Sequence, residues 1–153
     1  MPKFGYSIYG LDPAKTAKAS GRDVEISPKA AREVCRAIKG MKLDEAKEFL
    51  ENVTAKKKPV PYFRYKKQVP HRHGLEGWYA GKYPVKAARE ILKVLEGAEA
   101  NAEFKGLDAE KLRVIHAAAQ RGIKIRGVMR RAFGRSSPSV NQLAHVEIVV
   151  LEE

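Results

Sequence analysis

The C-terminal stretch from Lys111 to Leu151 constrains the fold of this chain more than any other segment. Two runs rich in β-branched and other apolar residues, 112–128 and 140–151, flank a turn-rich segment over 130–138 that contains Gly, Ser and Pro. This arrangement is typical of a β-hairpin. In the second run, every other residue from Ala144 onward is predicted to lie on a buried face. These residues are Ala144, Val146, Ile148 and Val150. The base of the hairpin is therefore expected to belong to the core.

The predicted arms are too long to lie on the body of the same domain. An arm of about 14 residues, at roughly 3.3 Å per residue, reaches on the order of 45 Å. A compact chain of this length has a radius of gyration of only about 15 Å. Toward the tip, Asn141 and Gln142 replace the apolar pattern of the second run. The distal half of the hairpin is therefore expected to project from the body.

The same stretch is strongly cationic. From Lys111 through His145 it contains no Asp or Glu, and the whole chain has a net charge of +12. This balance favours a nucleic acid or another anionic surface as the partner. A two-stranded ribbon is marginal in water, and phosphate contacts would order a cationic one. The alternative is a shorter, fully packed hairpin with a flexible basic loop. The basic residues of the stretch are Lys111, Arg113, Arg121, Lys124, Arg126, Arg130, Arg131 and Arg135.

The rest of the chain predicts one strand and three helices. A strand is expected over 16–26, interrupted by a bulge or turn near Ser20-Gly21. Ser27 and Pro28 are typical of a helix start, and Gly40 ends the apolar stripe that follows. A second helix is expected from Leu43 to the lysines before Pro59, and the longest from Tyr83-Pro84 to Phe104. Together with the hairpin, these elements predict an α+β fold with a small antiparallel three-stranded sheet.

A second acid-free block, from Ala55 to Leu75, interleaves basic and aromatic residues with prolines. In a loop that lies on RNA, phosphates would take the basic side chains while rings stack on unpaired bases. The alternative is a solvated, mobile loop with a few rings packed on the body. The basic residues of this block are Lys56, Lys57, Lys58, Arg64, Lys66, Lys67 and Arg72.

The sequence offers no convincing catalytic or metal site. The single cysteine, Cys35, lies on the apolar side of a predicted helix, where a buried thiol is more common than a nucleophile. His71 and His73 have too few neighbouring ligands for a zinc site. We find no nucleotide-binding loop and no clustered carboxylates for metal ions, and no apolar run approaches the ~20 residues of a spanning helix. The prediction is a protein without catalysis, cofactor, metal or membrane insertion.

Several short motifs, in their order and spacing, resemble the L-twenty-two family of large-subunit ribosomal proteins, in its archaeal and eukaryotic branch. The resemblance covers nearly the whole chain. It rests on Ile26-Ser27-Pro28-Lys29, on Val60 through Tyr65, on Asn101 through Asp108, on Arg131 through Arg135, and on His145-Val146-Glu147-Ile148. The hairpin tip falls on the fourth of these motifs.

The resemblance implies a body on large-subunit ribosomal RNA near the exit of the polypeptide tunnel. It also implies a hairpin whose tip lines that tunnel beside the nascent polypeptide. Tip residues would be Arg131, Gly134 and Arg135. The RNA-binding residues implied are Arg121, Lys124, Arg126, Arg130, Arg131 and Arg135 in the hairpin, and Lys56, Lys57, Lys58, Arg64, Lys66 and Lys67 in the middle insertion, which bacterial members lack. The acid-free block adds Arg72 to the predicted RNA-binding residues.

We expect a single ribosomal-protein domain over 1–153, with an N-terminal arm over 1–14, the insertion over 55–82 and the hairpin over 111–151. Its expected partners are large-subunit ribosomal RNA, neighbouring ribosomal proteins and the nascent polypeptide, in cytoplasmic ribosomes, without homo-oligomers. The alternative function is a free-standing, sequence-specific RNA-binding regulator that uses the same basic surfaces.

Overall fold

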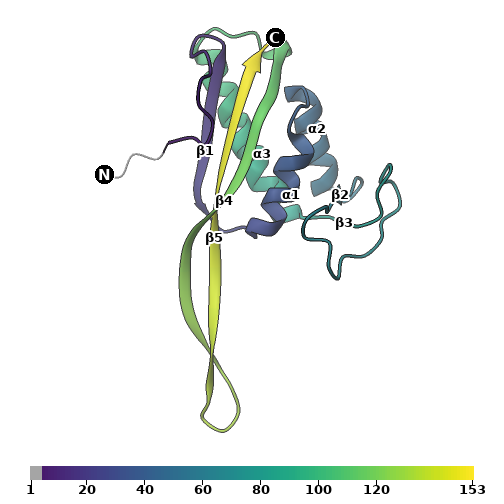
Figure 1. Ribbon diagram of the computed structural model, residues 1–153, viewed down its shortest axis with the longest axis vertical. Coiled ribbons are helices and arrows are strands. Elements are labelled where there is room, and N and C mark those ends of the chain that lie inside the picture. The colour runs from purple at the N-terminus through teal and green to yellow at the C-terminus, as the bar shows by residue number, and fades with distance from the viewer. Residues whose placement is uncertain (1–4) are drawn as a thin grey trace.

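The C-terminal strand forms the centre of the main sheet. The computed structural model describes residues 5–153. Its three-stranded antiparallel sheet has the order β1 (Thr16–Val24), β5 (Ser136–Glu152) and β4 (Leu112–Arg130) (Figure 1). The predicted α+β class with a long hairpin is confirmed. The first four residues of the predicted N-terminal arm lie outside the described residues.

The predicted helices form close to their expected bounds. They are α1 (Pro28–Ile38), α2 (Leu43–Thr54) and α3 (Val85–Phe104). Gly40, at a φ of +90°, follows the end of α1 in a conformation that glycine adopts at little cost. α3 begins at Val85 because Pro84, with a ψ of 66°, is not yet helical.

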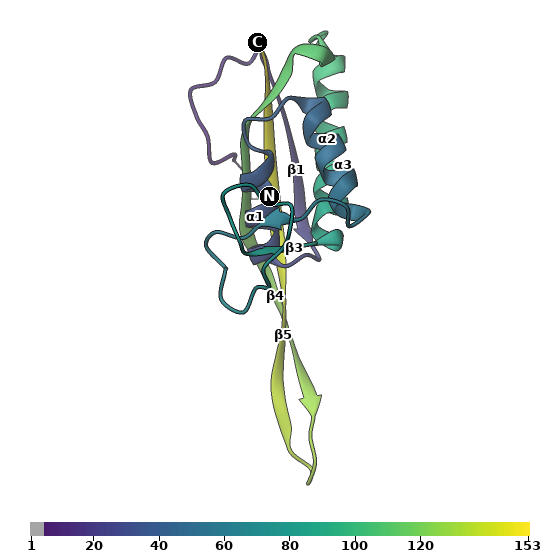
Figure 2. The same ribbon diagram turned by 90° about the vertical axis from the view of Figure 1, so that its right-hand side faces the viewer.

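One face of the sheet carries the apolar core. α3 packs on β1 and β5, α2 packs on α3, and α1 packs against β4. Ala144, Val146, Ile148 and Val150 are fully buried, as the alternation predicts. Figure 2 shows α2 and α3 together on one side of the sheet.

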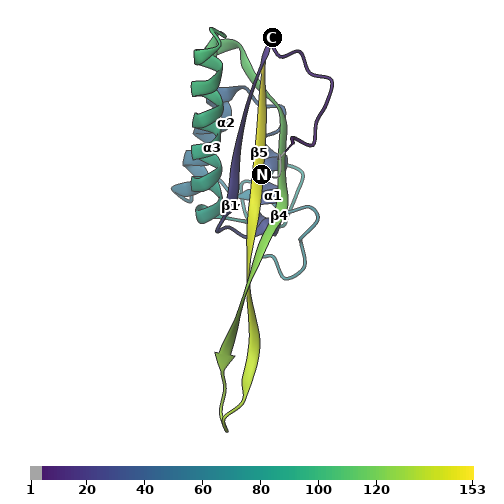
Figure 3. The ribbon, with the colours of Figure 1, turned by 90° about the vertical axis from the view of Figure 1, so that its left-hand side faces the viewer.

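The opposite face of the sheet is covered by the N-terminal arm. Figure 3 shows the segment before β1 on the side of the sheet away from α2 and α3. The backbone N–H and the hydroxyl of Ser7 both donate to the carboxylate of Glu147. His116 Nε2 lies 3.0 Å from Glu147 Oε1, and Gln120 Nε2 donates to the same oxygen at 3.2 Å. Glu147 is therefore only 2% exposed, and it joins the arm to both strands of the hairpin.

The three-stranded part of the sheet ends at a junction near Asp23. β1 has a bulge between Gly21 and Val24, as predicted, and Asp23 adopts a φ of 49° there. The N–H of Asp23 donates to His145 Nδ1 at 3.0 Å, and Asp23 Oδ1 accepts from the N–H of Ile123 at 3.2 Å. Beyond this point β4 and β5 continue as a pair.

The projecting pair closes with a shorter turn than the sequence suggested. Residues 136–138 pair with residues 128–130, so the predicted turn over 130–138 is wrong at both ends. Pro138 is tolerated opposite Val128 because a two-stranded ribbon leaves one side of β5 without a neighbouring strand. The remaining loop spans residues 131–135. Within the insertion, two short strands that the sequence did not indicate, β2 (Val60–Pro61) and β3 (Gly81–Lys82), pair with each other.

Glu147 gives the fold a testable dependence on pH. Burial acts to raise the pKa of Glu147, but the hydrogen bonds from Ser7 and His116 outweigh it and hold that pKa below its usual value. The stabilisation from the carboxylate is thus present above the unfolded-state pKa of about 4.3 and is lost as pH falls through the folded-state pKa.

Replacing this carboxylate should reduce stability mainly at neutral pH. We expect Glu147→Gln to lower the free energy of unfolding at pH 7 by about 1–3 kcal/mol. The difference in unfolding free energy between this variant and the unsubstituted protein should become smaller below pH 4. Chemical denaturation across a pH series measures both. Glu51→Gln, at an exposed helical position, is the control. If the difference in unfolding free energy were the same at all pH values, the stabilising role given to the Glu147 carboxylate would be contradicted.

A substitution at Gly122 tests how tightly the junction near Asp23 is packed. A Cβ at this position would lie 2.7 Å from Asp23 Oδ1 and 3.3 Å from the backbone carbonyl carbon of Leu143. We therefore expect Gly122→Ala to cost about 1–3 kcal/mol of unfolding free energy through overpacking. It should also speed hydrogen exchange of the neighbouring hairpin amides. Gly127→Ala is a matched control, since the nearest atom there is 3.9 Å away. Equal effects of the two substitutions would show that the junction is not tightly packed.

Candidate nucleic-acid interface

Three cations of the projecting hairpin share one face. Successive residues of a strand point to opposite faces, and paired residues of neighbouring strands share a face. Lys124, Arg126 and Arg130 therefore lie on the face that includes Gln142 and Ser136. Ile125 and Met129 lie on the other face. The distal ribbon thus has one cationic face and one largely uncharged face.

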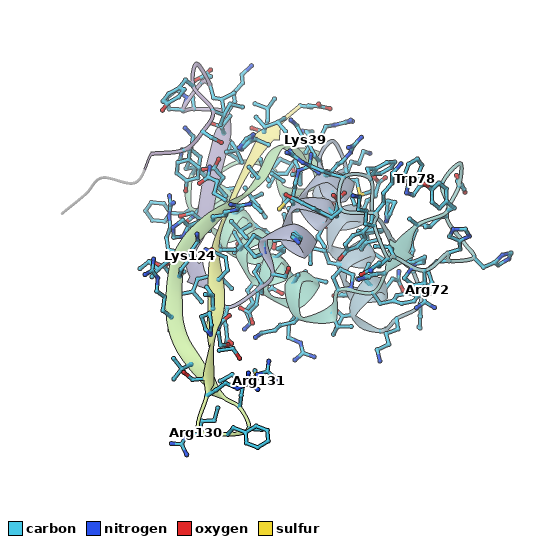
Figure 4. All side chains as sticks on the ribbon, turned by 60° about the horizontal axis from the view of Figure 1, so that its bottom comes forward. Lys39, Arg72, Trp78, Lys124, Arg130 and Arg131 are labelled. Atoms are coloured by element: carbon cyan, nitrogen blue, oxygen red, sulfur yellow. The ribbon has the colours of Figure 1, made fainter. Side chains whose placement is uncertain are left out.

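These cations are exposed and have no neutralising acid. Figure 4 shows Lys124, Arg130 and Arg131 spread along the hairpin toward its tip. Within residues 5–153, no salt bridge involves any of the six predicted hairpin contacts, which are Arg121, Lys124, Arg126, Arg130, Arg131 and Arg135. Their side chains are consequently available to phosphates.

The three predicted tip residues come together in the closing loop. The N–H of Arg131 donates to the carbonyl of Arg135 at 2.8 Å, and the N–H of Arg135 donates to the carbonyl of Ala132 at 3.3 Å. Phe133 and Gly134 have φ values of 57° and 66°. Two consecutive positive φ values at the centre of a tight turn are the pattern of a type I′ turn. The guanidinium Nε of Arg131 also donates to Ser137 Oγ at 2.7 Å, which holds this side chain against β5.

Glu33 anchors the loop that carries the basic residues of the insertion. Its carboxylate is buried on α1 and accepts the backbone N–H groups of Phe63, Arg64 and Tyr65 at 3.1–3.4 Å. Arg32 Nη1 donates to the same carboxylate at 3.0 Å. This anchor was missed in the sequence, where Glu33 resembles any other helical acid. It fixes Arg64 and Tyr65 on the surface of the body.

The remaining basic residues of the insertion are distributed around its aromatic rings. Lys56, Lys57 and Lys58 follow the end of α2, and all three are exposed. Lys66 and Lys67 are exposed in the loop after Tyr65. Lys66 Nζ lies 5.5 Å from the ring centre of Trp78, and the Arg72 guanidinium lies 5.3 Å from that of Tyr83. These contacts keep the cations beside rings while leaving them in solvent.

Several rings of the insertion pack on one another. The ring of Trp78 lies 4.7 Å from that of Phe63 and 4.9 Å from that of Tyr79, and His71 contacts Tyr79 edge-on. The indole N–H of Trp78 donates to the carbonyl of Tyr62 at 3.0 Å. Much of the aromatic surface that the sequence offers to bases is thus occupied within the loop, because the rings lower their exposure by stacking together.

Charge is distributed unevenly along the long axis. Figures 1 and 2 place the insertion loops beside the half of the body from which the hairpin projects, and the C-terminus at the opposite end. At that opposite end, Glu153 pairs with Arg113 at 2.9 Å and Asp108 pairs with Lys111 at 2.9 Å. The basic residues of the C-terminal stretch that have acidic partners are therefore those farthest from the tip.

The chemistry of the described residues gives no sign of catalysis. Burial raises the pKa of the Cys35 thiol to about 12, so it stays protonated at neutral pH. Between residues 5 and 153, no three or more His, Cys, Asp and Glu side chains gather in a way that could hold a metal ion. In the same part of the chain, no helix combines the length and apolarity needed to cross a membrane.

Comparison with known proteins identifies the family. The model of the family described as ribosomal protein L22p/L17e matches residues 19–151. Archaeal relatives named large ribosomal subunit protein uL22 match along nearly their full length. The protein of Methanocaldococcus jannaschii is 53% identical over 153 residues, covering 100% of this chain and 97% of that protein.

Two further relatives bear the same name. The protein of Methanopyrus kandleri is 57% identical over 159 residues, covering 100% of this chain and 99% of its own. That of Ignicoccus hospitalis is 50% identical over 157 residues, covering 99% of both chains. These proteins are structural and not enzymes, which confirms the prediction of a non-catalytic protein. The chain belongs to the ribosomal protein L22p/L17e family, in its archaeal branch, as its motifs predicted.

Proposed function

We propose that this chain is a structural constituent of the large ribosomal subunit that binds large-subunit ribosomal RNA. The observation that carries the proposal is the projecting hairpin, whose exposed cations have no acidic partner among the described residues. The names of the relatives, large ribosomal subunit protein uL22, support it. In this proposal the chain acts in cytoplasmic ribosomes, as one copy among neighbouring ribosomal proteins.

The low intrinsic stability of the projecting hairpin supports an RNA partner. A two-stranded ribbon without a covering layer is marginal in water, and the like charges of Lys124, Arg126 and Arg130 on one face repel one another. Phosphates that bind these side chains would replace repulsion by attraction and release counterions. The hairpin would therefore gain its rigidity from the RNA that surrounds it.

The uncharged parts of the hairpin also favour burial in a large assembly. Val128 is 74% exposed and Ile125 is 53% exposed in the isolated chain. Apolar side chains at this exposure, on a projecting ribbon, are typical of a surface that a partner covers. RNA sugars and bases, or neighbouring ribosomal proteins, would provide that cover.

The tip would meet the nascent polypeptide. With the body near the exit of the polypeptide tunnel and the hairpin directed inward, Arg131, Gly134 and Arg135 would line the tunnel wall. The tight loop of residues 131–135 supports this assignment, because its turn places two arginines close to the end of the ribbon. The insertion cations would bind RNA at the surface of the body.

Sedimentation tests membership of the particle. In a lysate of cells that express the tagged chain, we expect it to sediment with large ribosomal subunits at moderate salt and to be released only at high salt, because many phosphate contacts act together. Immunoblotting of gradient fractions measures this. Finding the chain in the soluble fraction at moderate salt would contradict the proposal and would favour a free-standing RNA-binding regulator.

Single substitutions test the hairpin contacts. Each phosphate neutralised contributes roughly 0.7–0.9 to the slope of log affinity against log salt concentration. We expect Arg126→Ala or Arg130→Ala to lower that slope for deproteinised large-subunit RNA by about this amount, with unchanged helix content. Filter binding across a salt series and circular dichroism measure the two. Lys39→Ala, on the body (Figure 4), is the control and should leave the slope nearly unchanged. A lowered melting temperature of the free Arg126→Ala protein would instead place this residue in the packing of the body.

A further inference from the structure

A cationic cavity lies on the body, between the start of α1 and the insertion. It has a volume of about 540 Å³, within the range of small-ligand pockets. Four basic residues and two tyrosines contribute most of its lining, and they are Lys29, Arg64, Lys67, Lys82, Tyr62 and Tyr65. No acidic residue lines it. None of the four cations forms a salt bridge within residues 5–153. Lys29 and Lys82 are outside the sets that the sequence assigned to RNA.

The walls of this cavity are held in place before any ligand arrives. The carboxylate of Glu33 binds the backbone N–H groups of Arg64 and Tyr65, which fixes the loop on one side. Lys29 Nζ lies 5.7 Å from the ring centre of Tyr65, and the Arg64 guanidinium lies 5.9 Å from it. The ring of Tyr65 therefore stands among cations, with part of its surface in solvent.

Tyr62 adds a hydrogen-bonding group to the cavity. Its side chain is only 5% exposed, and its hydroxyl forms no hydrogen bond with the residues that the structure describes. Burial, and then the charge of Glu33, raise the pKa of Tyr62 to about 12, so the hydroxyl remains a donor at neutral pH. The hydroxyl lies at the wall of the cavity, where it can donate to an acceptor that a ligand brings.

We propose that this cavity receives one unpaired nucleotide of ribosomal RNA, with its base against Tyr65 and its two flanking phosphates among Lys29, Arg64, Lys67 and Lys82. The chemistry fits each part of such a ligand. Arg and Lys bind phosphates, an exposed ring stacks on a base of any kind, and the Tyr62 hydroxyl donates to a sugar, base or phosphate oxygen. This site extends the RNA binding proposed above and rests on it.

RNAs that differ by one nucleotide test the site. The probes are a short RNA duplex with one unpaired adenosine and the same duplex without it. We expect the full-length protein to bind the first at least fivefold more tightly, because stacking of a base on an aromatic ring is worth about 1–3 kcal/mol and each 1.4 kcal/mol is tenfold. Fluorescence anisotropy of labelled RNA gives both affinities.

Substitutions then separate the parts of the site. Tyr65→Leu should abolish the preference for the unpaired nucleotide while the affinity for the plain duplex stays within about twofold, since hairpin cations supply most of that binding. Tyr62→Phe, which keeps the ring, should lower the preference by about two- to tenfold, the value of one hydrogen bond. Lys29→Gln with Lys82→Gln should reduce the salt slope for the bulged RNA by about 1.4, for two phosphates. Lys39→Gln with Lys42→Gln removes equal charge elsewhere and should leave the preference intact.

The outcomes distinguish this inference from the function on which it rests. Equal binding of the two RNAs by the unsubstituted protein, or an intact preference in a folded Tyr65→Leu variant, would overturn the nucleotide site and leave ribosomal RNA binding untouched. Failure to bind either RNA at low salt would instead count against the proposed function. Circular dichroism and melting temperature establish that each variant is folded.

Discussion

The pairing of β4 with β5, which continues past two bulges, connects the packed body of this molecule to its projecting cationic hairpin. Near the body, the paired strands are buried between helices and the N-terminal arm; beyond Asp23 the same ladder continues into solvent. Packing stabilises only the first part. The projecting part is weakly stable on its own, because a ribbon without a covering layer gains little from its backbone hydrogen bonds alone. The stable base therefore holds a cationic extension whose order depends on what surrounds it.

Periodicity explains why much of the fold was predictable. Apolar residues of β5 alternate and those of the helices recur at helical spacing, so the three-stranded sheet and three helices follow from local patterns. Glu147 and Glu33 were not predictable in this way. Each acid is buried because of groups far away in the chain, Ser7 for one and the backbone of Phe63 for the other. The length of the turn was overestimated because Ser136 and Pro138 are typical turn residues. In the structure they pair with β4, in a ribbon whose edges are free.

The candidate interface shows the same division between local and distant information. Acid-free runs are visible in the sequence, and the hairpin cations on them remain exposed in the structure. That Lys124, Arg126 and Arg130 share one face follows only from the pairing register of the strands, which a bulge between Arg121 and Lys124 shifts by one residue. The cavity at α1 is assembled from residues that lie far apart in the chain, with Lys29 on the helix, and Tyr65 and Lys82 at two distant positions of the insertion. No single stretch of sequence could reveal it.

The strand order has a consequence for how the protein is made. A chain leaves its site of synthesis N-terminus first, so β1 and all three helices emerge before β5, the strand that lies between β1 and β4. Until then β1 has no strand to pair with, and the central strand of the sheet, on which α3 also packs, is missing. Pairing of Thr16 with Leu151 joins the two ends of the sequence, and such distant contacts form slowly. The newly made chain thus passes through a stage in which its basic segments are complete while its hydrophobic core is not, and in that stage premature association with polyanions competes with folding.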